Sequence, residues 1–249
     1  MKISFIIPSY NEEKHIGQCL DSITRETSKY NHKTEIIVVN NASTDNTARI
    51  ASSFSGVRVV DEPHKGVIYA RQKGFELSSG DFIVNFDADS IMPDGWLAIA
   101  MEEFDKCPNL VALSGPVVYY DLPAKLNRLV RWYYYIGCVS SALNRFFFKS
   151  GPMLQLGGVM IKRTALEQIG GYNALFEFYG DDTDLACRLY KIGKVKFKFK
   201  LAFYSSGRRI LREGAWTMAM RYGLNYFHAT FFSKPFTKDH IDVRLHQKD

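Results

Sequence analysis

The stretch Phe82-Ile83-Val84-Asn85-Phe86-Asp87-Ala88-Asp89 is a short, nearly continuous apolar run that ends in two aspartates. This character is typical of a strand that is buried on both faces of a parallel sheet. Three comparable runs precede it, at residues 3–7, 35–39 and 57–60. The chain therefore opens with four candidate strands of one sheet, and the two aspartates mark the carboxyl end of the fourth.

Amphipathic stretches separate these runs. The spacing of their apolar residues predicts helices over residues 12–25, 43–54 and 66–77. Strands that alternate with helices form βαβ units, which predicts an α/β fold with a Rossmann-like, mainly parallel sheet flanked by helices. The crossover loops of such a sheet gather at the carboxyl ends of its strands, so ligands are expected there.

The second half of the chain is less regular. The alternating run at residues 195–200 predicts an edge strand with one buried face and one solvated row of lysines, which would discourage further strand pairing. From Arg208 onward the chain is basic and aromatic. The other expected elements are a strand at 110–119, an aromatic-rich stretch at 123–149, a loop and strand at 151–163, a short helix at 164–169 and a longer helix at 182–192.

Length and composition limit the kind of protein. The 249 residues suit one domain with an elaboration, and 46% hydrophobic with 23% charged residues excludes a disordered or fibrous chain. The net charge of +6 favours anionic partners such as nucleotides or phospholipid headgroups, whereas nucleic-acid binding is not expected because the sequence has no recognisable motif for it.

The cysteines and the N-terminus bear on the compartment. The four cysteines are widely spaced and indicate neither a zinc site nor a disulfide framework, so a reducing compartment is expected. The sequence contains no signal-peptide core and no apolar run long enough to span a membrane. We therefore expect a cytoplasmic protein.

Polar clusters follow the predicted strands at residues 8–12, 40–45 and 87–89, and a fourth cluster lies at 180–184. Asp87 and Asp89 leave the sheet together, and hard divalent cations prefer carboxylate oxygens that share the shell with phosphate oxygens and water. The pair therefore suits Mg²⁺ or Mn²⁺ that holds a diphosphate. An Asp-rich turn that caps the next helix is the alternative, and the order of the clusters favours the cation site.

This ordered set of clusters closely resembles the inverting family 2 glycosyltransferases, which have the GT-A fold and use nucleotide-diphosphate sugars. The resemblance runs from Ile3 to about Phe203. Besides Asp87-Ala88-Asp89, it rests on Ile6-Ile7-Pro8-Ser9-Tyr10-Asn11-Glu12, Val38-Val39-Asn40-Asn41-Ala42-Ser43-Thr44-Asp45-Asn46-Thr47, Lys65-Gly66, Ala70-Arg71, Gly157-Gly158, Gly170-Gly171-Tyr172 and Gly180-Asp181-Asp182-Thr183-Asp184-Leu185.

The resemblance implies a division of the chain. Residues 1–205 would form a single GT-A domain, with a nucleotide-binding half at 1–120 and an acceptor-binding half at 121–205. Residues 206–249 would form a helical, basic and aromatic extension.

The resemblance also implies a donor site. Asp89 and Asp87 would hold Mg²⁺ or Mn²⁺, and Arg71 is similar to the family's basic residue that faces the diphosphate. Asn40 stands where the family usually has an Asp that accepts a hydrogen bond from uracil. Asn still offers a carbonyl acceptor, so a UDP-sugar is favoured and a GDP-sugar is the alternative. The residues implied in nucleotide and donor binding are Pro8, Tyr10, Glu12, Asn40, Lys65, Arg71, Asp87 and Ala88.

The later acidic cluster implies the catalytic group. By the resemblance Asp182 is the catalytic base, with Asp181, Asp184 and Arg188 in support. Crowded carboxylates raise one another's pKa, which helps a base to hold the proton that it takes. Helix capping by acids is the alternative. The implied reaction is one displacement that inverts the anomeric carbon and moves a single sugar, since the Gln-x-x-Arg-Trp motif of processive members is not found in the sequence.

The acceptor is a glycan or a lipid-linked glycan by family association, as in cell-surface glycan or glycolipid synthesis. The aromatic and basic stretches at 132–148 and 216–232 could lie on an anionic membrane surface, which would make the protein peripheral on the cytoplasmic face. Packing over the sheet or a homodimer interface is the equally favoured alternative. His228, His240 and His246 are expected to be core or surface residues rather than metal ligands.

Two other functions stay open on the sequence. One is a Mg²⁺-dependent phosphohydrolase of the haloacid-dehalogenase type with Asp87 as nucleophile, although such enzymes place their first acidic pair near the N-terminus. The other is a sugar-nucleotide or lipid-binding module without turnover, which would leave Asp182 without a role.

Overall fold

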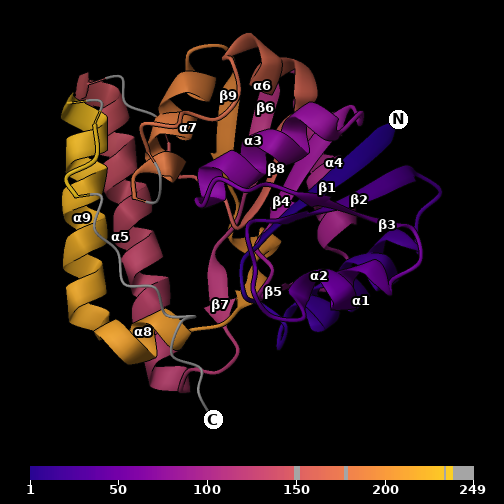
Figure 1. Ribbon diagram of the computed structural model, residues 1–249. Coiled ribbons are helices and arrows are strands. Elements are labelled where there is room, and N and C mark those ends of the chain that lie inside the picture. The colour runs from indigo at the N-terminus through magenta and orange to yellow at the C-terminus, as the bar shows by residue number, and fades with distance from the viewer. Residues whose placement is uncertain (149–151, 177–178, 233, 238–249) are drawn as a thin grey trace.

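The computed structural model describes residues 1–148, 152–176, 179–232 and 234–237. Figure 1 shows a central sheet with helices on both faces and, to one side, two long helices. The strands are β1 (Lys2–Ser9), β2 (Lys33–Asn40), β3 (Val57–Asp61), β4 (Phe82–Phe86), β5 (Ser90–Ile91), β6 (Leu110–Ser114), β7 (Val117–Tyr119), β8 (Gly158–Lys162), β9 (Lys194–Phe197) and β10 (Phe203–Ser205). The helices are α1 (Ile16–Thr27), α2 (Thr47–Ser52), α3 (Val67–Leu77), α4 (Trp96–Lys106), α5 (Ala124–Phe148), α6 (Arg163–Gln168), α7 (Asp181–Tyr190), α8 (Arg208–Glu213) and α9 (Ala215–Phe232), with a 3₁₀ helix η1 at Phe199–Leu201.

The main sheet has seven strands in the order β3-β2-β1-β4-β8-β6-β9. Its strands run parallel to one another except β8, which pairs antiparallel with both β4 and β6. The prediction of a mainly parallel α/β sheet is therefore confirmed. The carboxyl ends of β1, β2 and β4 meet at one edge, as the crossover helices require.

Two apolar layers cover the sheet, as its doubly buried strands require. On one face α1, α2 and α4 pack against alternate residues of β1, such as Phe5 and Ile7. On the other face α3, α6 and α7 pack against the remaining ones, such as Ile6. Because successive side chains of a strand point to opposite faces, the continuous apolar runs of the sequence supply both cores.

The expected strand at 110–119 is wrong as one element. Residues 110–114 form β6 in the main sheet, whereas residues 117–119 form β7, which belongs to a separate three-stranded sheet with β10 and β5. Gly115 and Pro116 separate the two strands. A Cβ at Gly115 would lie 2.0 Å from the carbonyl oxygen of Leu201, so the chain can pass there only with glycine, and proline has no N–H to continue a ladder.

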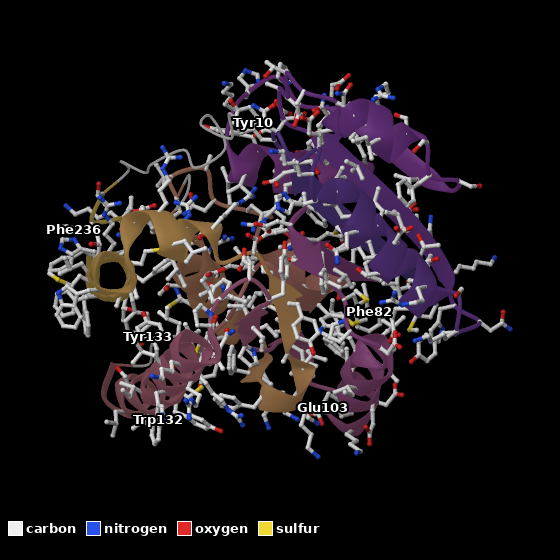
Figure 2. All side chains as sticks on the ribbon, turned by 90° about the horizontal axis from the view of Figure 1, so that it is seen from below. Tyr10, Phe82, Glu103, Trp132, Tyr133 and Phe236 are labelled. Atoms are coloured by element: carbon white, nitrogen blue, oxygen red, sulfur yellow. The ribbon has the colours of Figure 1, made fainter. Side chains whose placement is uncertain are left out.

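The edge position of the 195–200 run is confirmed, but its solvated row of lysines is wrong. β9 ends at Phe197, and η1 follows. Lys196 Nζ donates to Glu103 Oε2 at 3.0 Å, and Lys198 Nζ donates to Oε1 of the same residue. Glu103 is largely buried on α4, and Figure 2 shows it beneath the sheet edge. These two lysines therefore tie the edge strand to α4 and do not form a row of free charges.

The long helices α5 and α9 lie side by side next to the sheet (Figure 1). Met218 of α9 packs with Leu122 and Ile210, and Leu126 and Val130 of α5 lie against this small cluster. Ile210 comes from α8, which joins β10 to α9. In the described part of the chain, no helix combines the length and the apolar character that a membrane crossing needs.

The Glu103 contacts predict a pH dependence of stability. Hydrogen bonds from Lys198 and Lys196 lower the pKa of Glu103 from 4.5 to about 2. A carboxyl whose pKa is lower in the folded state stabilises the fold above pH 4.5, and this contribution is lost as the pH falls towards 2. We expect Glu103→Gln to lower the free energy of unfolding at pH 7 by about 1–3 kcal/mol and to flatten its dependence on pH in this window.

Urea unfolding followed between pH 2.5 and 7 measures both effects. Asp105→Asn is the matched control, because Asp105 is exposed on the same helix. Equal pH dependence of the wild type and Glu103→Gln would contradict the assignment.

Candidate active site

The carboxyl edge of the main sheet opens into a cleft of about 390 Å³. Its walls come from the ends of β1 and β4, the start of α3, the loop before β8, the start of α7, and the segment from β10 into α8 and α9. Most of the site residues expected from the sequence line it: Pro8, Tyr10, Lys65, Arg71, Asp87, Ala88, Asp89, Asp181 and Asp182.

The two aspartates after β4 have different partners. Asp87 Oδ1 accepts a hydrogen bond from Arg71 Nη2 at 3.0 Å. Asp89 Oδ1 accepts from Ser205 Oγ at 3.2 Å, and its Oδ2 accepts from Arg208 Nη2 at 3.0 Å. Both carboxylates therefore sit at the cleft wall with one oxygen held by an arginine.

This pair fits a hard divalent cation. The described residues contain no cluster of three or more His, Cys, Asp or Glu that could hold a metal by itself. Two carboxylates at the wall of an open cleft supply part of the oxygen shell that Mg²⁺ or Mn²⁺ requires, and such ions commonly complete it with phosphate oxygens and water. The donor set therefore suits a cation that arrives together with a diphosphate.

The second pair of acids begins α7. Gly180 precedes it with φ of 85°, a left-handed conformation that glycine adopts without strain and that turns the chain into the helix. Asp181 Oδ2 accepts from Arg71 Nη1 at 2.9 Å, and Asp182 Oδ1 accepts from the backbone N–H of Leu156 at 2.7 Å. The two neighbours are thus held by different groups.

Burial and proximity give these acids unusual proton affinity. Burial, with the added repulsion of Asp181, raises the pKa of Asp182 well above its usual value, although Arg71 opposes the shift. Burial also raises the pKa of Asp181, which Arg71 contacts directly. Asp182 therefore has the properties of a group that can take and hold a proton.

Arg71 connects the two acidic pairs. Its side chain is only 5% exposed and bridges Asp87 after β4 and Asp181 on α7. Burial would lower the pKa of Arg71, but the carboxylates of Asp87, Asp181 and Asp182 raise it. The guanidinium therefore stays charged and holds the two walls of the cleft at a fixed separation.

Tyr10 and Lys65 form one end of the cleft. Lys65 Nζ lies 4.7 Å from the centroid of the Tyr10 ring and 3.0 Å from its hydroxyl oxygen. Tyr10 directly follows the last residue of β1 and is labelled in Figure 2. The ring and the ammonium group together offer a surface for a planar, anionic ligand.

Two expected donor residues do not line the cleft. Glu12 is 1% exposed and forms ion pairs with Arg208 and with His15, the latter at 3.2 Å. Asn40 donates to Asp61 Oδ1 at 2.7 Å, and its Oδ1 accepts from the backbone N–H of Ser43 at 3.3 Å. Its carbonyl is therefore used within the β2 loop.

The expected supporting pair Asp184 and Arg188 also lies outside the cleft lining. Arg188 Nε donates to Asp184 Oδ2 at 2.8 Å, and its Nη1 donates to the carbonyl oxygens of Ile169 and Gly171 at 3.1 and 2.7 Å. These bonds fasten α7 to the turn after α6. Of the three tail histidines, His228 lies in α9 against Phe232 and Phe236, whereas His240 and His246 lie outside the described residues.

The sequence-based expectations missed the wall that the later part of the chain supplies. Arg208, Arg209, Tyr119 and Tyr222 all line the cleft. The run Arg208-Arg209 was a visible basic signal, but nothing in the sequence indicates that it returns to Asp89, 119 positions earlier.

Comparison with known proteins identifies the family. The model of the family "Glycosyl transferase family 2" matches residues 4–170. Over 176 residues the chain is 28% identical to poly-beta-1,6-N-acetyl-D-glucosamine synthase of Staphylococcus epidermidis, a match that covers 68% of this chain and 41% of that protein. The chain thus spans less than half the length of this relative.

Two solved structures have a similar fold. The mannosyltransferase PcManGT of Pyrobaculum calidifontis, in complex with GDP-Man and Mn²⁺, matches with a TM-score of 0.66 and 21% identity over 90% of this chain and 62% of that one. Glucosyl-3-phosphoglycerate synthase of Mycobacterium tuberculosis, in complex with Mn²⁺, UDP and phosphoglyceric acid, matches with a TM-score of 0.63 and 20% identity over 90% and 78%. The expected GT-A fold is confirmed, and the chain belongs to glycosyltransferase family 2.

Proposed function

We propose that the protein transfers one sugar from a nucleotide-diphosphate sugar to an acceptor hydroxyl with inversion at the anomeric carbon. One observation carries the proposal: Asp87, Asp89 and Asp182 line the same cleft, with Arg71 bridging the acids after β4 to those on α7. A donor diphosphate and a sugar between these walls would meet charge-stabilising groups on one side and a proton acceptor on the other.

The donor side is built for a diphosphate. Asp87 and Asp89 would hold Mg²⁺ or Mn²⁺, which, when bound, stabilises the negative charge of the departing nucleoside diphosphate. Lys65 and Tyr10 would bind the nucleotide at the end of the cleft. The Mn²⁺ and nucleotides bound by PcManGT and by glucosyl-3-phosphoglycerate synthase support this assignment.

The acceptor side has the proton acceptor. Asp182 takes the proton from the acceptor hydroxyl as this oxygen attacks, and its raised pKa lets it keep that proton. Asp181 pairs with Arg71 and therefore holds Arg71 and the start of α7 in position. A single displacement from the face opposite the diphosphate inverts the anomeric carbon.

We favour a UDP-sugar as donor, with a GDP-sugar as the alternative. The UDP bound by glucosyl-3-phosphoglycerate synthase supports this preference. The side chain of Asn40 does not contribute to it, because both its amide and its carbonyl form bonds near the end of β2. The neighbouring Asn41 lines the cleft, but its amide bonds to Glu62 and His64 carbonyl oxygens. Base recognition would therefore come from the backbone and from Tyr10.

Family membership favours glycosyl transfer over the two other functions that the sequence left open. A phosphohydrolase with Asp87 as nucleophile needs a reactive carboxylate, whereas Asp87 is paired with Arg71. A module without turnover would gain nothing from a buried acid of raised pKa such as Asp182.

We also propose that the acceptor is presented at an anionic membrane surface, where the protein binds peripherally through α5. Leu129, Trp132, Ile136, Val139 and Leu143 recur at intervals of three and four along α5, and each is more than half exposed. Figure 2 shows Trp132 on the outer side of this helix. An exposed apolar stripe with aromatic residues suits the boundary between headgroups and acyl chains.

Charge selects the partner of this stripe. The sequences of α5 and α9 contain no acidic residue, and Lys125, Arg128 and Arg131 are exposed on α5. A second copy would bring like charges together, whereas anionic lipids would complement them. The described cysteines Cys19 and Cys107 are free thiols, which is consistent with the cytoplasmic face.

Replacing the proposed base tests the reaction. We expect Asp182→Asn to lower kcat by about 10²- to 10⁴-fold and to leave donor affinity nearly unchanged, since a base acts on the acceptor proton. Asp105→Asn is the control, because Asp105 is exposed on α4 and lies outside the cleft lining. Release of nucleoside diphosphate in the presence of acceptor measures the effect, and equal kcat for Asp182→Asn and wild type would contradict the role.

A panel of nucleotide sugars tests the donor and the cation together. We expect one UDP-sugar to raise the Tm by several degrees in the presence of Mn²⁺ and much less in EDTA, because ligands that bind the folded state stabilise it. Asp89→Asn should abolish the difference between Mn²⁺ and EDTA. A stabilisation by GDP-sugars alone would select the alternative donor, and a shift independent of both Mn²⁺ and Asp89 would argue against the cation site.

Vesicle binding tests the membrane surface. We expect Ile136→Ser combined with Val139→Ser to weaken binding to phosphatidylglycerol-containing vesicles at least ~10-fold, because burying each aliphatic side chain contributes about 1.5–3 kcal/mol. Leu175→Ser is the control, since Leu175 is 63% exposed on another part of the surface. Salt should weaken wild-type binding, and neutral vesicles should bind poorly. Dimers that the double substitution dissociates would instead identify a second copy as the partner.

A further inference from the structure

Arg208 occupies a special position between two carboxylates. Its Nη2 donates to Asp89 Oδ2 at 3.0 Å and also to Glu12 Oε1. Glu12 is 1% exposed, Asp89 is 16% exposed and Arg208 is 15% exposed, so the contact is largely shielded from water. A positive charge of the protein itself therefore lies against the acid that is expected to hold the cation.

The backbone around Arg208 is fixed by its own set of bonds. Asp121 accepts from Ser206 Oγ at 2.6 Å and from the backbone N–H of Gly207 at 2.5 Å. Ser205, the last residue of β10, donates a hydrogen bond to Asp89. The turn that begins α8 is thus held on both sides, and it presents the guanidinium to the end of β4.

One donor nitrogen of the guanidinium has no partner in the described part of the protein. Among the described residues Nη1 of Arg208 is buried and has no hydrogen-bond partner, although Arg208 lines the cleft. A buried guanidinium nitrogen without a partner is costly, so an anionic ligand there would relieve it. Burial would lower the pKa of Arg208, but Asp89 and Glu12 raise it, and the side chain stays charged.

We infer that Arg208 is a positioning residue that makes cation binding depend on the nucleotide diphosphate. Without a ligand, Arg208 neutralises Asp89 and Glu12 and competes with a divalent cation for Asp89. When a diphosphate enters, one of its oxygens accepts a hydrogen bond from Nη1 of Arg208. Its negative charge also lies between the guanidinium and the cation, so Arg208 and the cation can both remain next to Asp89. This inference rests on the proposed function, since it requires that cation and diphosphate share the cleft.

The physical reason is the balance of charge in a small, shielded volume. A divalent cation on Asp89 without a diphosphate would lie within a few ångströms of the guanidinium, and their repulsion is weakly screened where water is excluded. The diphosphate removes this repulsion. Coupling of this kind is reciprocal: the nucleotide tightens the cation by the same factor as the cation tightens the nucleotide.

Mn²⁺ binding measured from the free-ion electron paramagnetic resonance signal tests the inference without turnover. The titration is done with no nucleotide and with saturating UDP, for the wild type, Arg208→Gln and Arg208→Lys. For the wild type we expect UDP to tighten Mn²⁺ by about 10-fold or more, within the usual range of coupling between sites. For Arg208→Gln we expect Mn²⁺ alone to bind about 10-fold tighter, because the competing charge is gone and Glu12 and Asp89 keep theirs. UDP should then add little.

The other variants separate charge from a loss of structure. Arg208→Lys keeps the charge and should restore most of the coupling. Arg212→Gln, an exposed arginine of the same helix, should match the wild type. Circular dichroism and Tm show whether each variant is folded.

Three results of the Mn²⁺ titrations distinguish the possibilities. If Mn²⁺ alone binds Arg208→Gln no tighter than the wild type while UDP still tightens it, the inference is overturned and the cation site survives. If the wild type binds no Mn²⁺ even with UDP, the cation part of the proposed function fails and the inference fails with it. Tighter Mn²⁺ binding by Arg208→Gln with reduced coupling to UDP supports the inference.

Discussion

The buried guanidinium of Arg71 is the interaction on which the candidate site depends. It joins Asp87, at the end of the fourth strand, to Asp181, which begins α7 some 94 residues later in the chain. Removing one partner of a buried ion pair leaves an uncompensated charge, which is far more costly than the pair is stabilising. Breaking either ion pair would be costly, so Arg71 keeps the end of β4 and the start of α7 close together, with Asp182 next to Asp181.

Asp181 and Asp182 have identical side chains but different hydrogen-bond partners. Asp181 is paired with a charged guanidinium, whereas Asp182 is held by one backbone N–H at Leu156. The backbone bond orients Asp182 without supplying a full positive charge. Burial and the repulsion of Asp181 therefore keep the pKa of Asp182 well above its usual value, which suits the base role proposed for it. The roles proposed for the two acids therefore follow from their partners and not from their positions in a motif.

Sequence patterns predicted the elements of the first half well, because their apolar runs are set by local burial. The fourth strand at 82–86 agrees with β4, and the acids that follow it reach the expected edge of the sheet. The predictions were wrong where contacts between distant parts of the chain determine the local structure. Gly115 divides the strand expected at 110–119, and Glu103 on α4 recruits lysines that the alternating pattern assigned to solvent. Neither partner is near in sequence.

The same limit applies to the site. A resemblance can indicate that Glu12 and Asn40 belong to the nucleotide region. It does not show that Arg208 pairs with Glu12 or that Asn40 donates a hydrogen bond to Asp61. Arg208 and Tyr222 enter the cleft from α8 and α9, beyond the residues matched by the family model. Their placement depends on how the chain returns from β10, which no local pattern encodes.

The helix α8, which follows β10, links the cleft to α9. At its start Arg208 contacts Asp89 and Glu12. At its end Glu213, which is 1% exposed, pairs with Arg209 of the same helix and with Arg221 of α9. The six residues of α8 therefore connect Asp89, the proposed cation ligand, to the long helix α9, which lies beside α5. A shift of Arg208 on ligand binding would be transmitted to α9 through the ion pair between Glu213 and Arg221, because the pair of Glu213 with Arg209 lies within α8. Because a buried pair resists separation, α8 and α9 would move as one unit, and Tyr222, which lines the cleft from α9, would move with them.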